Sequence, residues 1–177
     1  MKKISTEKTF YFLLLFTTTF FLQSCDLFGD DNDAPQQLPE ATQTGANTFG
    51  CLINGEPFVV TNTSQIVAIY QGGLIQIGGR KSIGDYDEGL SFDLYNPLVE
   101  NKTYIFDNNS YKAGYTFREG DFKCQYTFDK TILGTITLTN IDKINYIVSG
   151  TFQFETKKDG CSDINITNGR FDIRYIP

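Results

Sequence analysis

The sequence contains no histidine and no tryptophan, and only one methionine among its 177 residues. The lack of histidine excludes Ser-His-Asp and Cys-His nucleophilic sites, His-ligated zinc, and an imidazole general base near neutral pH. The four cysteines form no CxxC pair, so the spacing of a zinc site is also absent. Only 15 Lys and Arg stand against 21 Asp and Glu, and the resulting net charge of -6 disfavours a nucleic-acid partner. We therefore expect a protein without enzymatic activity and without a cofactor.

The N-terminus has the pattern of an export signal. Lysines near the start precede an apolar run from Phe10 to Leu22, which fits the h-region of a signal peptide and is too short to span a bilayer. The tetrapeptide Leu22-Gln23-Ser24-Cys25 follows. It resembles the lipobox of bacterial lipoproteins, although Gln23 stands where a small residue is usual. The resemblance implies a signal peptide over residues 1–24 and acylation of Cys25, whose acyl chains would bind the protein to a membrane.

Residues 25–47 have the composition of a disordered tether that follows the acylated cysteine. The stretch has no basic side chain and includes an acidic cluster of Asp30, Asp31 and Asp33. The cluster lacks the spacing of an EF-hand, so we predict no metal site there. It resembles the surface-export signal of Bacteroidota lipoproteins, which implies an outer-membrane lipoprotein exposed at the cell surface. Asp26 resembles an inner-membrane retention signal of other Gram-negative lineages, so the destination stays open, and a periplasm-facing domain is the alternative.

From residue 48 to residue 177, apolar and polar residues alternate with a period of two, and no window has the apolar stripe of a helix. Turn pairs such as Asn54-Gly55 and Gly72-Gly73 separate the alternating segments. The predicted strands lie at about 48–53, 56–61, 65–71, 74–79, 89–95, 103–106, 111–118, 122–128, 132–139, 144–155 and 164–175. The pattern predicts a single all-β domain over residues 48–177, an antiparallel meander of about ten strands that forms a β-sandwich or a partly open barrel.

The side chains predicted to point inward are rich in aromatic residues, which favours a filled core. The alternative is a closed calycin-like barrel that carries a small apolar ligand in its lumen. Tyr95 alternates with the inward-facing Phe92 and Leu94, so we expect it to face outward, where it could stack on a sugar ring or a partner. Asp85, Asp87 and Glu88 stand between Gly84 and Gly89 and are interpreted as a solvated acidic turn, and the alternative is a loop that holds calcium.

The last predicted strand changes its inward face along its length. Ile166 has one parity, whereas Phe171 and Ile173 have the other. One extra residue is needed to switch the face, and Asn168-Gly169 supplies the left-handed backbone that a β-bulge prefers. We predict a bulge near Gly169, and the alternative is a hairpin turn at Asn168-Gly169.

Three segments are similar to motifs of a small, uncharacterised Bacteroidota lipoprotein family, a domain of unknown function. They are Thr48-Phe49-Gly50-Cys51 running into Asn54-Gly55, Ser149-Gly150-Thr151-Phe152-Gln153-Phe154, and Asn168-Gly169-Arg170-Phe171-Asp172. The resemblance covers most of residues 41–177 and implies a lipid-anchored β domain with no established activity. Two hypotheses remain: a non-enzymatic lipoprotein that binds a glycan or protein or serves an envelope complex, and a barrel that carries an apolar ligand.

Three cysteines remain once Cys25 is acylated, and in an exported protein two of them are expected to pair. Cys51 and Cys124 lie in predicted strands, whereas Cys161 lies in a predicted turn. We predict a Cys51–Cys124 disulfide, with Cys161 as the alternative partner. In a simple meander, the Cα atoms of Cys124 and Cys161 would be farther apart than the limit of about 7 Å, so their pairing would favour a closed barrel.

Overall fold

The structure, a computed structural model, describes residues 37–177. Within this part, regular structure consists of strands and two single-turn 3-10 helices. The strands are β1 (Thr48–Ile53), β2 (Glu56–Val59), β3 (Ile66–Gln71), β4 (Leu74–Ile83), β5 (Tyr86–Tyr95), β6 (Lys102–Ile105), β7 (Tyr111–Glu119), β8 (Phe122–Tyr126), β9 (Thr131–Asp142), β10 (Ile147–Thr156) and β11 (Ile164–Arg174). The 3-10 helices are η2 (Thr63–Gln65) and η3 (Phe128–Lys130). Among residues 37–177, no helix has the length and hydropathy needed to cross a membrane.

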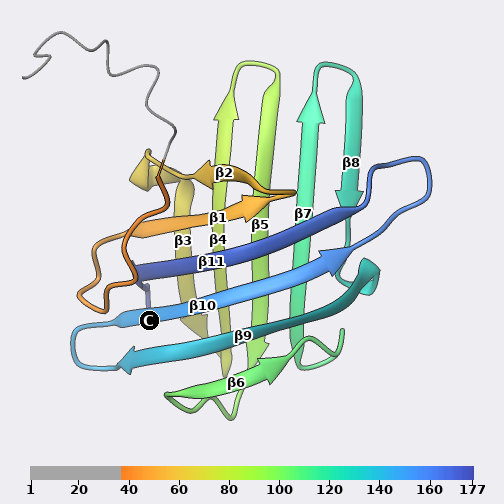
Figure 1. The fold of residues 1–177 in the computed structure, drawn as a ribbon. Coiled ribbons are helices and arrows are strands. Elements are labelled where there is room, and N and C mark those ends of the chain that lie inside the picture. The colour runs from red at the N-terminus through yellow and green to blue at the C-terminus, as the bar shows by residue number, and fades with distance from the viewer. Residues whose placement is uncertain (1–36) are drawn as a thin grey trace, which may run out of the picture. The chain divides into compact units, whose positions relative to one another are not determined.

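The strands form two antiparallel sheets. Sheet A has six strands in the order β2-β1-β11-β10-β9-β6, and sheet B has five in the order β3-β4-β5-β7-β8. Figure 1 shows sheet A in front of sheet B, with the strands of one sheet crossing those of the other. The hairpins β4–β5 and β7–β8 extend beyond β2, the upper edge strand of sheet A in that view. The prediction of an all-β antiparallel domain in the form of a sandwich is confirmed.

The two sheets do not close into a barrel, so the alternative of a closed calycin-like barrel is wrong. The hypothesis of an apolar-ligand carrier required the lumen of such a barrel. The chain order also differs from a simple meander. The first and last strands, β1 and β11, are paired, and β6 pairs with β9 in sheet A although β5 and β7 are neighbours in sheet B. These pairings are long-range, which is why alternation within single strands did not predict them.

Aromatic side chains fill the space between the sheets. Phe92 of sheet B contacts Phe152 of sheet A, with ring centroids 4.7 Å apart, and Phe152 contacts Phe49 at 5.4 Å. Gly79 of β4 leaves room for the ring of Phe49, because a Cβ at this position would lie 2.4 Å from that ring. The ring contacts pack the sheets closely, and the predicted filled core is confirmed.

The predicted bulge in the last strand is confirmed. Between the pairs Gly50–Arg170 and Leu52–Thr167, β11 has one more residue than β1. On its other side, β11 likewise has one more residue than β10 between the pairs Phe152–Gly169 and Phe154–Ile166. Asn168 adopts a φ of 52°, the left-handed backbone that the bulge requires. The hairpin alternative is wrong, since β11 is continuous through this point.

The β9–β10 connection differs from the prediction. The alternation placed Ile144 and Tyr146 on the inward face of a strand beginning at residue 144, but β10 begins at Ile147. Ile144 is 87% exposed in the turn, and Tyr146 has a φ of 56°, which a strand cannot accommodate.

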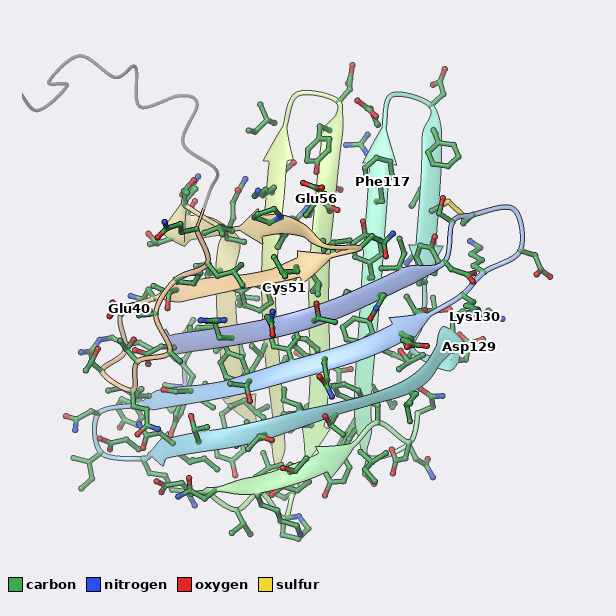
Figure 2. The ribbon with its side chains drawn as sticks, in the orientation of Figure 1. Glu40, Cys51, Glu56, Phe117, Asp129 and Lys130 are labelled. Atoms are coloured by element: carbon green, nitrogen blue, oxygen red, sulfur yellow. A yellow bond between two sulfur atoms is a disulfide. The ribbon has the colours of Figure 1, made fainter. Side chains whose placement is uncertain are left out.

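The disulfide joins Cys124 to Cys161, with the Cα atoms 6.0 Å apart, so the predicted Cys51–Cys124 pairing is wrong. Cys124 is in β8 of sheet B and Cys161 is in the loop between β10 and β11 of sheet A; Figure 2 shows the yellow bond beside β8. Facing sheets bring the two residues together, which a flat meander could not do. Cys51 is a buried free thiol in β1, and burial raises its pKa to about 12.

Candidate functional site

An open groove lies on the outer face of sheet B, the face turned away from the viewer in Figure 1. Its volume is about 690 Å³. Residues with little or no side chain form the floor: Gly78 of β4 lies opposite Ser91 of β5, and Gly89 of β5 lies opposite Arg80. The missing side chains in the middle of the sheet create the hollow.

Hydrogen-bonding side chains surround this floor. They come from η2 and from four strands, and comprise Ser64, Gln65, Arg80, Ser82, Asp87, Thr116, Lys123 and Gln125. Gln65 donates from Nε2 to the carbonyl oxygen of Ser82 at 3.1 Å, which holds η2 against the end of β4. The groove therefore offers both hydrogen-bond donors and acceptors, together with a charged row at one end.

The charged row crosses three strands. Asp87 of β5 lies opposite Arg118 of β7, and Arg118 lies opposite Lys123 of β8. Arg80 donates from Nε and from Nη2 to the two carboxylate oxygens of Asp87, the latter at 2.5 Å. The hydrogen bond from Arg80 is the largest cause that lowers the pKa of Asp87, and Arg118 and Lys123 lower it further. Asp87 is thus an ionised carboxylate surrounded by three cations.

Aromatic rings border the groove next to Ser91. Gly114 of β7 lies opposite Ser91, and a Cβ at Gly114 would lie 3.3 Å from the ring of Phe128, so this ring covers the strand there. The Nζ atom of Lys112 lies 5.6 Å from the ring centroid of Tyr95 and 5.8 Å from that of Phe128. Tyr95 is 39% exposed, which confirms the prediction that it faces outward.

A second hollow of about 540 Å³ lies on the outer face of sheet A. Thr103, Thr137 and Thr151 form a row across β6, β9 and β10, and the hydroxyls of Thr103 and Thr137 are 2.8 Å apart. Arg170 is the one charged residue among those that line it. This surface supplies hydroxyl groups but fewer kinds of ligand-binding chemistry than the groove on sheet B.

A smaller pocket of about 240 Å³ opens near the disulfide and is lined by Glu88, Tyr115 and Phe122 among others. The hydroxyl of Tyr115 donates to Glu88 at 2.6 Å, and Tyr126 donates to the carbonyl oxygen of Ser162 at 2.5 Å. Burial and the neighbouring Glu88 raise the pKa of Tyr115. Because these hydroxyl protons are already used within the protein, the polar groups stabilise the end of the sandwich.

Asp172 of β11 is fully buried and accepts hydrogen bonds from the segment before β1 and from Ser149 of β10. The donors are the hydroxyl of Thr42 at 2.7 Å, the amides of Thr44, Gly45 and Ala46 at 2.9, 2.8 and 3.1 Å, and the hydroxyl of Ser149 at 2.7 Å. Burial opposes ionisation of Asp172, but these hydrogen bonds outweigh it and lower the pKa to about 2. Residues 42–46 are thereby fixed to the sandwich, and the predicted disorder up to residue 47 does not hold for them.

The remaining predicted site residues have different outcomes. Cys25 and the acidic residues Asp30, Asp31 and Asp33 lie outside the described residues. The interpretation of Asp85, Asp87 and Glu88 as a solvated turn holds for Asp85, which is exposed in the turn before β5. It is wrong for Asp87 and Glu88, since β5 begins at Tyr86 and their two side chains occupy opposite faces. Asp87 contributes to the groove and Glu88 to the smaller pocket. The alternation of β5 would have assigned Asp87 and Glu88 to opposite faces, but the predicted strand began at residue 89, three residues after the observed start at Tyr86.

Metal ligands do not cluster in this domain. Across residues 37–177, no group of three or more His, Cys, Asp or Glu side chains has a geometry that could hold a metal ion.

A family model described as Domain of unknown function (DUF6252) matches residues 47–173. No curated protein and no solved structure matches the chain. The match begins at Asn47, directly before β1, and ends at Ile173 in β11, so it spans both sheets and the groove.

Proposed function

Since the chain belongs to the DUF6252 family, whose description names no activity, we propose its function from the chemistry of its surface and of its N-terminus. It is a lipid-anchored envelope lipoprotein that binds a glycan chain in the groove on sheet B and catalyses no reaction. The observation that carries the binding role is the groove of about 690 Å³, ringed by hydrogen-bonding side chains over a floor of small residues.

The lining of the groove favours a glycan over a peptide. A sugar ring presents many hydroxyl groups that both donate and accept hydrogen bonds, and Gln65, Thr116 and Gln125 can do the same. Peptide recognition depends on apolar or aromatic anchors seated in pockets, whereas Val67 and Leu90 are the apolar side chains of this lining. The ring of Phe128, which covers the strand at Gly114, adds a surface for stacking beside the groove.

The charges favour binding over catalysis. Hydrolysis of a glycosidic bond uses two carboxyl groups placed on either side of that bond. Asp87 is the one carboxylate among the described residues that line the groove, and its pKa is lowered by Arg80. A carboxylate held ionised by an arginine is a poor proton donor near neutral pH.

The anchor is supported by the N-terminal sequence. Leu22-Gln23-Ser24-Cys25 follows an apolar run of signal-peptide length. Two or three acyl chains on Cys25 would hold the protein stably on a membrane, since each buried CH₂ group contributes about 0.8 kcal/mol.

The anchor is tested by Cys25→Ala in the cell that makes the protein. We expect the wild type to partition into the detergent phase, and the variant to remain uncleaved or to be found in the aqueous phase. Cys51→Ala is the matched control, because it removes a buried thiol that the anchor does not use. Equal detergent partitioning of wild type and Cys25→Ala would contradict acylation at this residue.

The groove is tested by filling it. Ser91→Tyr places a large side chain on the exposed floor, at a strand position where tyrosine is well tolerated. We expect it to weaken glycan binding by at least about tenfold, since it occupies the space of the ligand. Thr151→Tyr is the control, because Thr151 is also an exposed mid-strand residue but lies on sheet A. On a glycan array with full-length protein in detergent, loss in Thr151→Tyr instead would assign binding to the other face.

A further inference from the structure

We propose that the groove selects an acidic glycan, one whose sugars carry a carboxylate or a sulfate ester. The inference deepens the proposed function and rests on it. It follows from the excess of positive charge at one end of the groove. Arg80 and Lys123 line the groove there, and Arg118 lies beside it, paired across the strands with Asp87 on one side and with Lys123 on the other.

Arg118 on β7 and Lys123 on β8 have no carboxylate partner of their own. Within residues 37–177, neither Arg118 nor Lys123 forms an ion pair. Asp87 balances one of the three charges near it, so the row carries an uncompensated positive charge. The chain as a whole has a net charge of -6, so this local excess runs against its composition.

Asp87 positions Arg80 for a ligand. Its carboxylate takes the Nε donor and one Nη2 donor of the guanidinium, two of the five N–H donors of an arginine. The side chain of Arg80 is 58% exposed while that of Asp87 is 12% exposed, so the pair presents arginine rather than carboxylate to the solvent. A carboxylate or sulfate on a sugar can accept from the remaining donors and lie close to Lys123.

The small floor places the sugar ring next to these charges. Gly89 lies directly opposite Arg80 in the neighbouring strand, and Thr116 lies opposite Gly89 on its other side. A ring lying over Gly89 would have its exocyclic substituents within reach of both the charged row and the hydroxyl of Thr116. The groove thus combines one position for the ring with one position for its acidic group.

The test uses full-length protein in detergent and paired oligosaccharides that differ only in charge. One pair is an oligogalacturonate and its methyl ester, and the other is a sulfated galactan oligosaccharide and its desulfated form. The protein variants are Arg118→Gln and Lys123→Gln, alone and combined. Lys143→Gln serves as the control, because Lys143 is an exposed lysine in the turn between β9 and β10 of sheet A and does not line the groove.

We expect at least one acidic member to bind more tightly than its neutral partner, with affinity reduced about tenfold by the combined variant and unchanged by Lys143→Gln. Higher salt should weaken binding of the acidic member more than that of the neutral one. The pair that responds distinguishes a carboxylate from a sulfate ligand. Equal binding of charged and neutral members would overturn the acidic selection and leave glycan binding in place. Binding of no oligosaccharide on the array would overturn both.

Discussion

Removing the disulfide between Cys124 and Cys161 is expected to lower the free energy of unfolding by about 4 kcal/mol. The bond closes a loop with a sequence separation of 37 residues, and it joins β8 at the edge of sheet B to the β10–β11 loop of sheet A. Without it, the unfolded chain gains conformational freedom, and the folded state loses a covalent link between the two sheets.

The measurement is urea unfolding of Cys124→Ala/Cys161→Ala beside the wild type with and without reductant. The double variant avoids leaving an unpaired thiol, and reductant should destabilise the wild type but not the variant. In the folded wild type, Cys51 should resist thiol reagents, because it is buried and its pKa is raised to about 12. A peptide map without reduction that links Cys51 to Cys124 would contradict the pairing.

Replacing Asp172 with asparagine is expected to lower the free energy of unfolding by about 3 kcal/mol and to release the segment before β1. The amide would direct its own N–H groups at donors such as Gly45 N and Ser149 Oγ, which now meet a carboxylate oxygen. Because the folded-state pKa is about 2, below the usual value for an aspartate, the carboxylate stabilises the fold above about pH 4 and the stabilisation is lost as the pH falls towards 2.

The comparison for this prediction is Asp142→Asn. Asp142 also accepts backbone amides, from Ile144 at 2.8 Å and from Asn145 at 2.9 Å, but it does so at an exposed turn. We expect Asp142→Asn to cost less than about 1 kcal/mol, since solvent can replace its hydrogen bonds. Amide hydrogen exchange at residues 44–46 should become fast in Asp172→Asn alone. Retained protection there would show that other contacts hold the segment.

The strands and turns were predictable because their signals are local. Asn54 adopts a φ of 52° in the β1–β2 turn, and Asn168 adopts the same value at the bulge, both at positions where the sequence pairs asparagine with glycine. Alternation then located every strand to within a few residues. The outward position of Tyr95 followed from the same alternation.

The partners of the strands were not predictable from this signal. Alternation states which face of a strand is apolar, but it does not state which sheet the strand joins. β6 shows the consequence, since it pairs with β9 across a long sequence separation while its neighbours in sequence join the other sheet. The disulfide depended on that assignment, and for this reason the predicted partner of Cys124 was wrong.

The groove and the buried carboxylate were missed for related reasons. Arg118 and Lys123 meet Asp87 only when the register of three strands is known. Asp172 lies between Phe171 and Ile173, so alternation assigns it to the solvent face of β11. It is buried because Thr42 and its neighbours fold over it, and those polar residues have the composition of a linker.

Amide chemical-shift mapping decides most directly whether the outer face of sheet B binds glycans. The ¹⁵N-labelled full-length protein in detergent micelles is titrated with the acidic oligosaccharide that binds most tightly. We expect the shifts to centre on Gly78, Gly89 and Thr116, with side-chain shifts for Gln65 and Gln125 at the rim of the groove. Shifts confined to the threonine row of sheet A, or an unchanged spectrum at saturating oligosaccharide, would contradict a glycan-binding groove on sheet B.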